Sequence, residues 1–261
     1  MFKVQRTPRL VRSPVFLLSA GRSGSTLLRS VLDTHSQIHS PLQLVLTELE
    51  VTFPRFRVEV SFGTLGLDVE ELEYILWDRV LDRELKRSGK TVLVDNAPAL
   101  LFQWRRLAEC WPEARYIFLI RHPANIVASA EENSGPRGKD RAWCLQLTDS
   151  FLRILHLLHA AREELPGLTV RYEDLTADPA QTCAAICEFL GLEWEPTMLD
   201  YSAVDHGQAV GSGDFSENLR SGRIRANRQV PTEKDVPLPL RAIARNLGYT
   251  APAEVPSVRP G

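Results

Sequence analysis

A short apolar segment followed by a turn of small residues constrains this chain more than any other feature. Residues 15–18 are all apolar and predict a buried strand. The turn that follows contains Gly21 and Gly24, and glycine allows both a tight bend and a close approach of the backbone to a ligand. Beyond the turn, apolar residues recur at helical spacing, at Leu27, Leu28, Val31 and Leu32. The segment therefore predicts a strand, a tight turn and a helix with one core-facing side.

This turn has the composition of an anion-binding loop. Its backbone N–H groups and the positive end of the following helix are expected to point at one place. Arg22 adds a positive charge, and the same turn holds three hydroxyl groups, on Ser23, Ser25 and Thr26. An ordinary strand-to-helix turn does not require an arginine, two glycines and three hydroxyl groups together. We therefore expect residues 21–26 to bind phosphate or a chemically similar anion.

Two known loop motifs of similar composition do not match. A Walker A loop has the pattern G-x-x-x-x-G-K-[ST], whereas Gly24 is followed directly by Ser25 and the turn contains no lysine. The nucleophile elbow G-x-S-x-G also fails, because Ser25 stands where its second glycine is required. The loop is thus P-loop-like in composition without being the loop of a nucleotide kinase.

Further along the chain, short apolar segments alternate with segments of helical pattern. Strands are predicted at residues 91–94, 116–120 and 168–171, and helices at 98–107, 125–131, 141–165 and 179–190. The fully apolar segment 116–120 is typical of a central parallel strand covered on both faces. This alternation predicts an α/β fold, with a single domain over residues 1–261 and a central parallel sheet flanked by helices. Ligands of such sheets bind at the carboxyl ends of the strands.

Composition and charge narrow the class of protein. A formal net charge of −2 argues against nucleic-acid binding through bulk charge. We find no segment of transmembrane length. Residues 1–12 are basic and predict a solvated tail, and residues 251–261 contain three prolines and predict a loose tail.

The four cysteines point to core packing and a reducing compartment. Cys183 and Cys187 lie one helical turn apart, which favours packing in a core over metal binding. No cysteine and histidine group has zinc-ligand spacing, so we expect no metal site. Free thiols are typical of the cytoplasm, which is the expected location.

Four segments, in order, resemble sulfotransferases that use 3′-phosphoadenosine 5′-phosphosulfate (PAPS), in the bacterial branch related to protein-tyrosine sulfotransferases. Residues 21–28 resemble the loop that binds the 5′-phosphosulfate. Residues 118–129 resemble the 3′-phosphate motif, in which an arginine and a serine stand eight residues apart. The other two are residues 170–175 with the helix ending 189–191, and residues 221–225 with 247–249. Each motif is short, and the order of all four makes the resemblance specific.

The resemblance implies a set of cosubstrate-binding residues. These are Gly21, Arg22, Ser23, Gly24, Ser25 and Thr26 for the phosphosulfate, Arg121 and Ser129 for the 3′-phosphate, Arg223 closing over that phosphate, and Tyr172 near the adenine. Taken alone, Arg121 fits a surface salt bridge, Ser129 an ordinary helix hydroxyl and Tyr172 a core aromatic. The combination of Arg121 and Ser129 behind an apolar strand favours the ligand.

The acceptor side departs from the family pattern. Many relatives carry a glutamate base where residue 43 is glutamine, and glutamine cannot accept a proton at neutral pH. Relatives also tend to carry lysine after the aspartate that ends the second strand, whereas Asn96 follows Asp95 here. The resemblance thus places Gln43, Asp95 and Asn96 in the substrate pocket.

No single residue is identified as the base from the sequence. Glu48 is the candidate catalytic carboxylate, because it lies about one helical turn beyond Gln43 if that segment is helical. The plainer interpretation is that Glu48 lies on a solvated helix face. Asp95, His39 and His206 are the other candidates.

These residues imply transfer of a sulfuryl group from PAPS to a hydroxyl or amine of a small-molecule, glycan or lipid acceptor. Arg22 stands where the family places the cation that stabilises charge on the bridging oxygen. Segments 44–88 and 132–142 are expected to wall and cover the acceptor pocket. Positions 43 and 96 leave open a homologue that binds PAPS or its product 3′-phosphoadenosine 5′-phosphate (PAP) with impaired transfer. A phosphotransferase is disfavoured by the missing Walker lysine.

Overall fold

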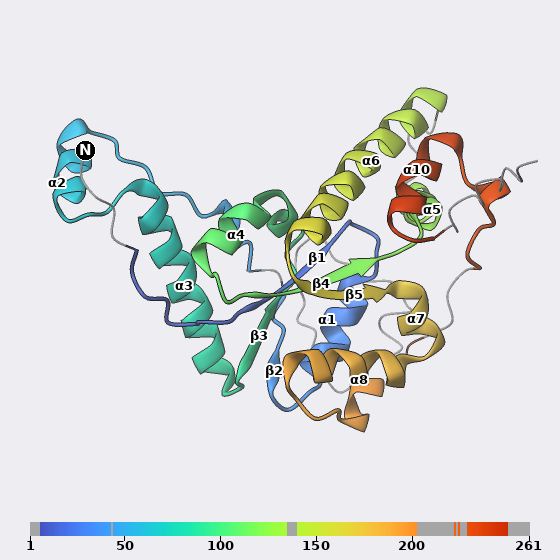
Figure 1. Cartoon of the computed structure of the whole chain (residues 1–261), viewed down its shortest axis with the longest axis horizontal. Coiled ribbons are helices and arrows are strands. Elements are labelled where there is room, and N and C mark those ends of the chain that lie inside the picture. The colour runs from blue at the N-terminus through green and yellow to red at the C-terminus, as the bar shows by residue number, and fades with distance from the viewer. Residues whose placement is uncertain are drawn as a thin grey trace, which may run out of the picture.

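A five-stranded parallel sheet forms the centre of the computed structural model, which describes residues 6–42, 44–134, 140–202, 222, 224 and 229–249. The strands are β1 (Val15–Ser19), β2 (Ile38–His39), β3 (Val92–Asp95), β4 (Arg115–Ile120) and β5 (Gly167–Arg171). Their order is β2-β3-β1-β4-β5, and every pairing is parallel (Figure 1). The predicted α/β fold with a central parallel sheet is confirmed.

Helices connect and cover these strands. The α-helices are α1 (Ser25–Asp33), α2 (Phe56–Thr64), α3 (Val69–Ser88), α4 (Trp104–Cys110), α5 (Pro123–Asn133), α6 (Arg141–Glu164), α7 (Tyr172–Ala177), α8 (Pro179–Leu190) and α10 (Leu238–Asn246). Short 3-10 turns are η1 (Leu46–Glu48), η2 (Pro98–Gln103), η3 (Pro196–Leu199) and η4 (Glu233–Asp235). The single helix expected over 98–107 is a 3-10 turn followed by α4. The helix expected from residue 125 begins at Pro123, because proline fits the first helical position.

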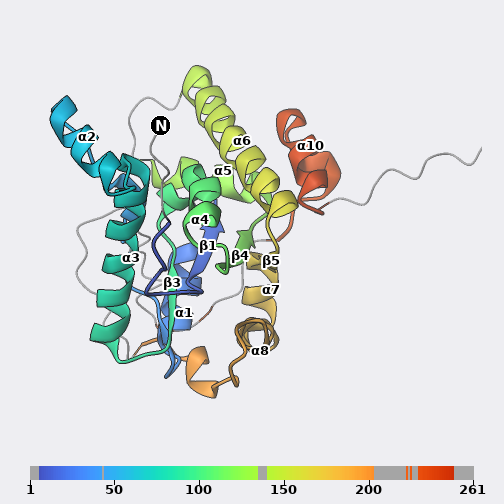
Figure 2. The same cartoon turned by 60° about the vertical axis from the view of Figure 1, so that its left-hand side comes forward.

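Alternation along the strands divides the core into two layers. Phe16 and Leu18 of β1 pack in one cluster with residues of α3, α4, α6 and α10. Val15 and Leu17 pack in the other cluster, with residues of α1, α7 and α8. Figures 1 and 2 show these two groups of helices on opposite sides of the sheet. Burial on both faces is the reason that the inner strands β1, β3 and β4 contain continuous apolar runs.

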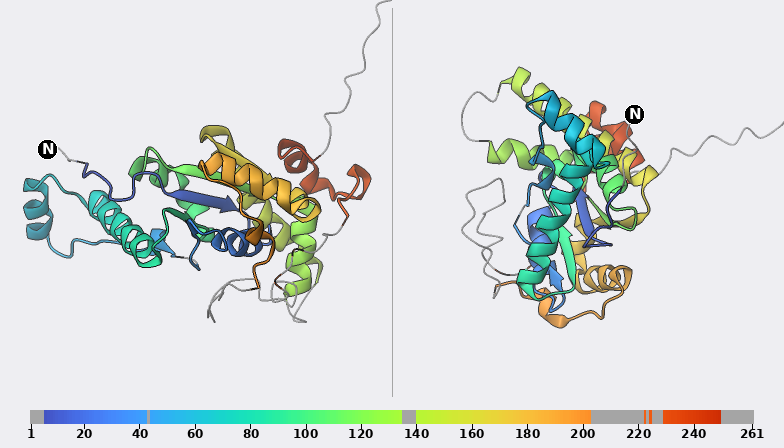
Figure 3. Two further views of the ribbon diagram at one scale, coloured as in Figure 1. Left: turned by 90° about the horizontal axis from the view of Figure 1, so that it is seen from below. Right: turned by 90° about the vertical axis from the view of Figure 1, so that its left-hand side faces the viewer.

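Helix α3 is a core element that the sequence analysis missed. The segment 44–88 is expected to form pocket wall and lid, and within it residues 69–88 form a helix whose Tyr74, Trp77 and Leu81 are fully buried in the core. The helix has ordinary end signals: Asp68 accepts the Glu71 N–H at one end, and Gly89 has φ 68° at the other. Charged residues make up much of α3, so its narrow apolar stripe is difficult to recognise in the sequence. In contrast, no residue of α2 is buried, and Figure 3 shows α2 at one end of the molecule, away from the sheet.

The N-terminal segment is bound to α3. The Thr7 N–H and the Arg9 guanidinium donate to Glu71, at 2.7 Å and at 2.9–3.0 Å. The solvated tail expected over residues 1–12 is therefore wrong for residues 7–11. A basic residue of this segment, Arg9, pairs with the buried Glu71 of α3 and is not simply solvated.

Two further sequence expectations concern cysteines and membranes. Cys183 and Cys187 are buried in the core, as predicted, and burial raises the pKa of their thiols to about 12 and about 11. Across the described ranges, no group of three or more His, Cys, Asp or Glu side chains is arranged to hold a metal ion. Every helix in these same ranges is too short or too polar to span a lipid bilayer.

The Asp78 carboxylate gives a direct test of how the N-terminal segment is held. It accepts the Leu10 and Val11 N–H groups at 2.6 and 3.1 Å and the Trp111 indole N–H at 3.3 Å. Asp78→Ala leaves these donors without an acceptor, so we expect the free energy of unfolding to fall by about 2–4 kcal/mol in urea denaturation.

Asp82→Ala on the same helix is the matched control. Asp82 pairs only with long side chains that are mostly exposed, Arg79 and Lys86, among the described residues. Asp82 is itself only 6% exposed, but when it is removed both partner side chains can turn to water, so the expected loss is less than about 1 kcal/mol. Equal losses for the two variants would contradict a special role of Asp78.

Candidate functional site

The loop between β1 and α1 has the backbone of a tight, close-packed turn. Gly24 occupies the N-cap position of α1 with φ 94°, and Arg22 has φ 65° although it is not glycine. A Cβ atom on Gly24 would lie 2.3 Å from Cδ2 of Tyr172. Both the dihedral angle and the space therefore require glycine at position 24. The left-handed conformation of Arg22 costs about 1–3 kcal/mol, which is typical of residues held at a functional site.

The first turn of α1 presents its amide groups without a side-chain cap. Gly24 has no side chain that could accept one of these N–H groups, and the first turn contains no acidic residue. The N–H groups of this turn and the helix dipole together favour a bound anion. Ser23 Oγ is buried and makes no hydrogen bond within the described part of the chain. The loop thus fits an anionic group.

Three residues predicted to bind the cosubstrate meet beside this loop. The Arg22 Nε–H donates to Ser129 Oγ at 3.3 Å, which joins the loop to α5. Arg121 donates from Nη1 to the Arg22 carbonyl at 2.9 Å, which joins β4 to the loop. The fold therefore brings together residues that lie on three separate elements.

Tyr172 completes this arrangement from the start of α7. Its ring contacts the Gly24 position and lies 4.4 Å from the guanidinium carbon of Arg121. Arg121 is only 8% exposed, so its charge acts in surroundings of low polarity, where an anion is bound strongly. Two guanidinium groups, a serine hydroxyl and a helix N-terminus make one positively charged site.

Asp95 lies at the end of β3 and is fully buried. Its carboxylate accepts the Ala97 N–H at 3.1 Å and also the N–H groups of Leu44 and Asn96. Burial raises the pKa of Asp95 to about 6, although these three donors lower it. The other carboxylate oxygen, Oδ2, and Oδ1 of Asn96 make no hydrogen bond with any described residue. Asp95 therefore holds the segment directly after position 43.

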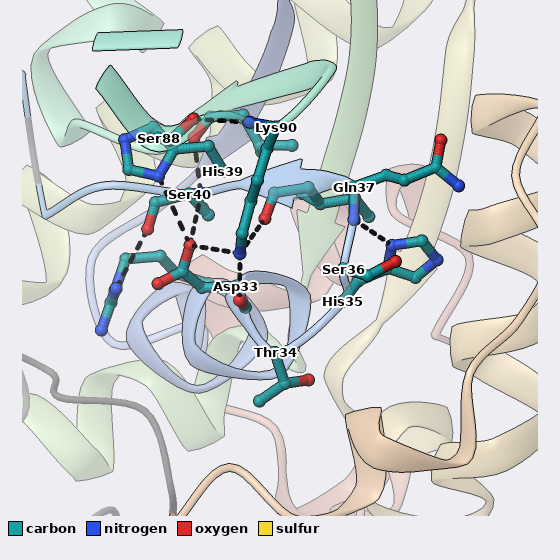
Figure 4. A network of polar contacts seen from close by, with 12 residues as sticks. Asp33, Thr34, His35, Ser36, Gln37, His39, Ser40, Ser88 and Lys90 are labelled. Carbon is teal, nitrogen blue, oxygen red and sulfur yellow. Dashed lines mark hydrogen bonds and ion pairs between the residues drawn. The ribbon is translucent and has the colours of Figure 1, made fainter. Parts of the chain in front are cut away.

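A polar network fixes the segment before position 43. Asp33, the last residue of α1, accepts the Ser40 N–H at 2.8 Å, and Lys90 donates to the carbonyls of Asp33 and Ile38 at 2.6 and 2.8 Å (Figure 4). Burial alone raises the pKa of Asp33, but the nearby His39 ring, the hydrogen bond from the Ser40 N–H and the charge of Lys90 hold it below its usual value. The network binds α1, β2 and β3 into one support.

The remaining sequence candidates lie in different surroundings. Glu48 is exposed, and the helical segment expected around it is only the 3-10 turn η1. His39 lies 3.7 Å from the Asp33 carboxylate and belongs to the network. Gln43, His206 and Arg223 are outside the described residues.

Sequence reasoning missed Arg29 and Lys90, which support the site without entering it. The buried Arg29 donates to the Ser40 carbonyl at 3.1 Å. The available signal was Arg29, a basic residue among the apolar residues of the first helix, because a buried charge requires a partner.

The raised pKa of Asp95 predicts a pH-dependent contribution to stability. A carboxyl that titrates near 6 when folded and near 4 when unfolded favours folding in its neutral form, so its ionisation destabilises the fold as pH rises through that interval. Asp95→Asn is neutral throughout. We expect the stability of this variant relative to wild type to increase by about 2 kcal/mol from about pH 4.5 to about pH 7.5.

Chemical denaturation of both proteins across this pH range measures that difference. Other acids with shifted pKa values contribute equally to both proteins and cancel. A difference that is constant with pH would show that the Asp95 carboxyl titrates normally.

Comparisons with known proteins agree with the geometry. The nodulation protein NoeE of Sinorhizobium fredii is 26% identical over 249 residues, covering 83% of this chain and 59% of that protein. Protein-tyrosine sulfotransferase 2 of Gallus gallus is 21% identical over 197 residues, covering 72% of this chain and 53% of that protein. The chain thus spans between about half and three fifths of the length of these curated relatives.

Solved structures share the fold. The sulfotransferase domain of the Synechococcus PCC 7002 olefin synthase matches with a TM-score of 0.60 at 21% identity, and that of the curacin biosynthetic pathway with 0.60 at 22%. Each match covers 95% of this chain and 100% of the domain. A sequence model of the sulfotransferase family matches residues 14–196, well over half of the chain. The chain belongs to the sulfotransferase family.

Proposed function

We propose that this chain transfers a sulfuryl group from PAPS to a hydroxyl or amine of a small-molecule, glycan or lipid acceptor. The observation that carries this proposal is the meeting of Arg22, Arg121 and Ser129 at the loop before α1. PAPS carries anionic groups on both the 5′ and the 3′ oxygens of its ribose, so its enzyme needs two anion-binding sets in one site. The contacts of Arg22 with Ser129 and Arg121 support the assignment of two such sets to adjoining elements.

The proposed roles follow from the donor groups. Residues 21–26 hold the 5′-phosphosulfate through backbone N–H groups and hydroxyls. Arg121 and Ser129 hold the 3′-phosphate, since the forked guanidinium suits a phosphate group. Tyr172 lies beside the adenine, and Arg223 is proposed to close over the 3′-phosphate.

The reaction itself needs positioning and charge stabilisation. The acceptor oxygen or nitrogen attacks the sulfur atom, the bond from sulfur to the bridging oxygen breaks, and PAP leaves with that oxygen. Arg22 stabilises the negative charge that develops there, as cations do in phosphoryl transfer.

The proton of the acceptor must go to a base. Glu48 is exposed and thus open to an acceptor, whereas Asp95 has no exposed surface. We therefore assign proton removal to Glu48, and we assign to Asp95 the support of the segment that it binds.

A homologue that binds PAP without transfer is the second candidate. Asn96 favours it, because a neutral, buried carboxamide stands where relatives tend to carry a lysine. The two candidates share the nucleotide site and differ only in chemistry.

Nucleotide selectivity tests the shared site. Isothermal titration calorimetry should show that PAP binds well and that ATP, which lacks a 3′-phosphate, binds poorly. Arg121→Ala should weaken PAP binding by about 10–100-fold, the effect of losing hydrogen bonds to a charged group, and should remove the preference. Arg153→Ala, an exposed arginine on α6, is the control and should bind like wild type. Equal affinity of the wild type for PAP and ATP would overturn the assignment.

Transfer of label from radioactive PAPS tests the chemistry. With a panel of hydroxylated and amine acceptors, wild type should label at least one, and Arg22→Ala should lower kcat by about 10²–10³-fold. Arg153→Ala again serves as the control. If wild type binds PAP but labels no acceptor on the panel, the second candidate is favoured.

A further inference from the structure

Glu173 joins two distant parts of the chain behind the nucleotide site. One carboxylate oxygen accepts the His122 N–H at 3.0 Å, and the other accepts the Tyr249 hydroxyl at 2.7 Å. His122 directly follows Arg121, and Tyr249 lies just beyond α10. The carboxylate therefore connects the residue after the proposed 3′-phosphate ligand to the end of the described chain.

His122 transmits this connection to α5. Its ring is buried, and Nδ1 accepts the Ala124 N–H at 3.2 Å, which caps the helix that carries Ser129. Burial lowers the pKa of His122, although Glu173 raises it, and the neutral ring is the form that can accept this hydrogen bond. The ring also packs edge-on against Tyr249, with the centroids 5.1 Å apart.

The turn that carries Tyr249 is anchored independently of Glu173. Arg162 of α6 donates to the Asn246 carbonyl at 2.7 Å, and Arg171 donates to the Gly248 carbonyl at 2.9 Å. The Arg171 guanidinium also lies over the Tyr249 ring, 4.7 Å from its centroid. Three attachments to α6 and β5 make this turn a fixed point, against which Glu173 can hold His122.

Two consecutive residues after β4 contact two consecutive residues at the start of α7. The Arg121 guanidinium lies over the Tyr172 ring, and the next residue, His122, donates its N–H to Glu173. The end of β4 is therefore held to α7 by two adjacent contacts. Losing the second contact frees the backbone at His122, and with it the backbone that carries the Arg121 side chain.

We propose that Glu173 is a positioning residue for the 3′-phosphate site, fixing the Arg121–Pro123 segment and the start of α5 to the anchored turn at Tyr249. This inference rests on the proposed function, because it assumes that Arg121 and Ser129 bind the 3′-phosphate. Both carboxylate oxygens of Glu173 accept protein donors, so we assign Glu173 no contact with the nucleotide. Its effect is therefore confined to how well Arg121 and Ser129 are placed.

The readout is the ratio of affinities for PAP and adenosine 5′-phosphate, which differ only in the 3′-phosphate. Calorimetry should show that Glu173→Ala weakens PAP binding about tenfold while leaving adenosine 5′-phosphate within about twofold. Glu173→Gln keeps an oxygen for the His122 N–H and should retain most of the wild-type ratio. Tyr249→Phe removes the hydroxyl anchor and should lower the ratio a few-fold. Asp174→Ala, an exposed acid on the same helix, is the control and should match wild type.

The outcomes separate this inference from the proposed function. A wild type without preference for PAP overturns the proposed function. A wild type that prefers PAP, with Glu173→Ala reducing both affinities equally, shows a merely structural role and overturns the inference. Melting temperatures accompany each measurement. If Glu173→Ala does not fold, Tyr249→Phe decides: a ratio equal to that of wild type overturns the inference.

Discussion

The placement of Arg121 is the interaction on which the rest of the site depends. Its guanidinium is held between the carbonyl of Arg22 and the ring of Tyr172. This one side chain therefore ties β4 to the loop before α1 and to the start of α7. A buried positive charge is costly unless it is partnered, so the arrangement constrains all three elements at once.

The parallel sheet explains why these elements meet. The register pairs Ser19 of β1 with Leu119 of β4, and Ile120 of β4 with Arg171 of β5. The three strands therefore end at nearly the same level, and the residues that follow them are neighbours. The core on both faces holds the strands in this register, since a shift of one residue would exchange the two clusters.

On the proposed acceptor side, buried polar groups fix the backbone around position 43. Asp95 binds the N–H of Leu44, and Ser40 is held by Asp33 and Arg29. Both contacts fix the segment on either side of position 43, where the family pattern expects its base. The segment around position 43 is supported by residues of β3 and α1 and follows β2. Its geometry therefore depends on how these three elements pack together.

Elements with a strong local signal could be predicted from the sequence, and long-range contacts could not. The run of apolar residues at 116–120 marked a central strand, and Asp178, Pro179 and Gly191 marked the ends of α8, as the structure has them. Helix α3 was missed because charged residues dominate its composition. The binding of residues 7–11 to α3 was missed because a basic segment looks the same whether its partner is water or a buried acid. Glu173 lay within a recognised segment, but its partners are 51 and 76 residues away.

The sequence by itself determined the local features that suit the first loop to an anion, because glycines, hydroxyls and a helix start act locally. It also determined the alternation of strands and helices that gives a parallel sheet. Only the tertiary structure decided that Arg22 meets Ser129 and Arg121, which lie 107 and 99 residues further along the chain. It alone decided that Asp95 titrates near 6, because burial sets that value. Local propensity depends on neighbours in the chain, whereas contact and burial depend on how the whole chain packs.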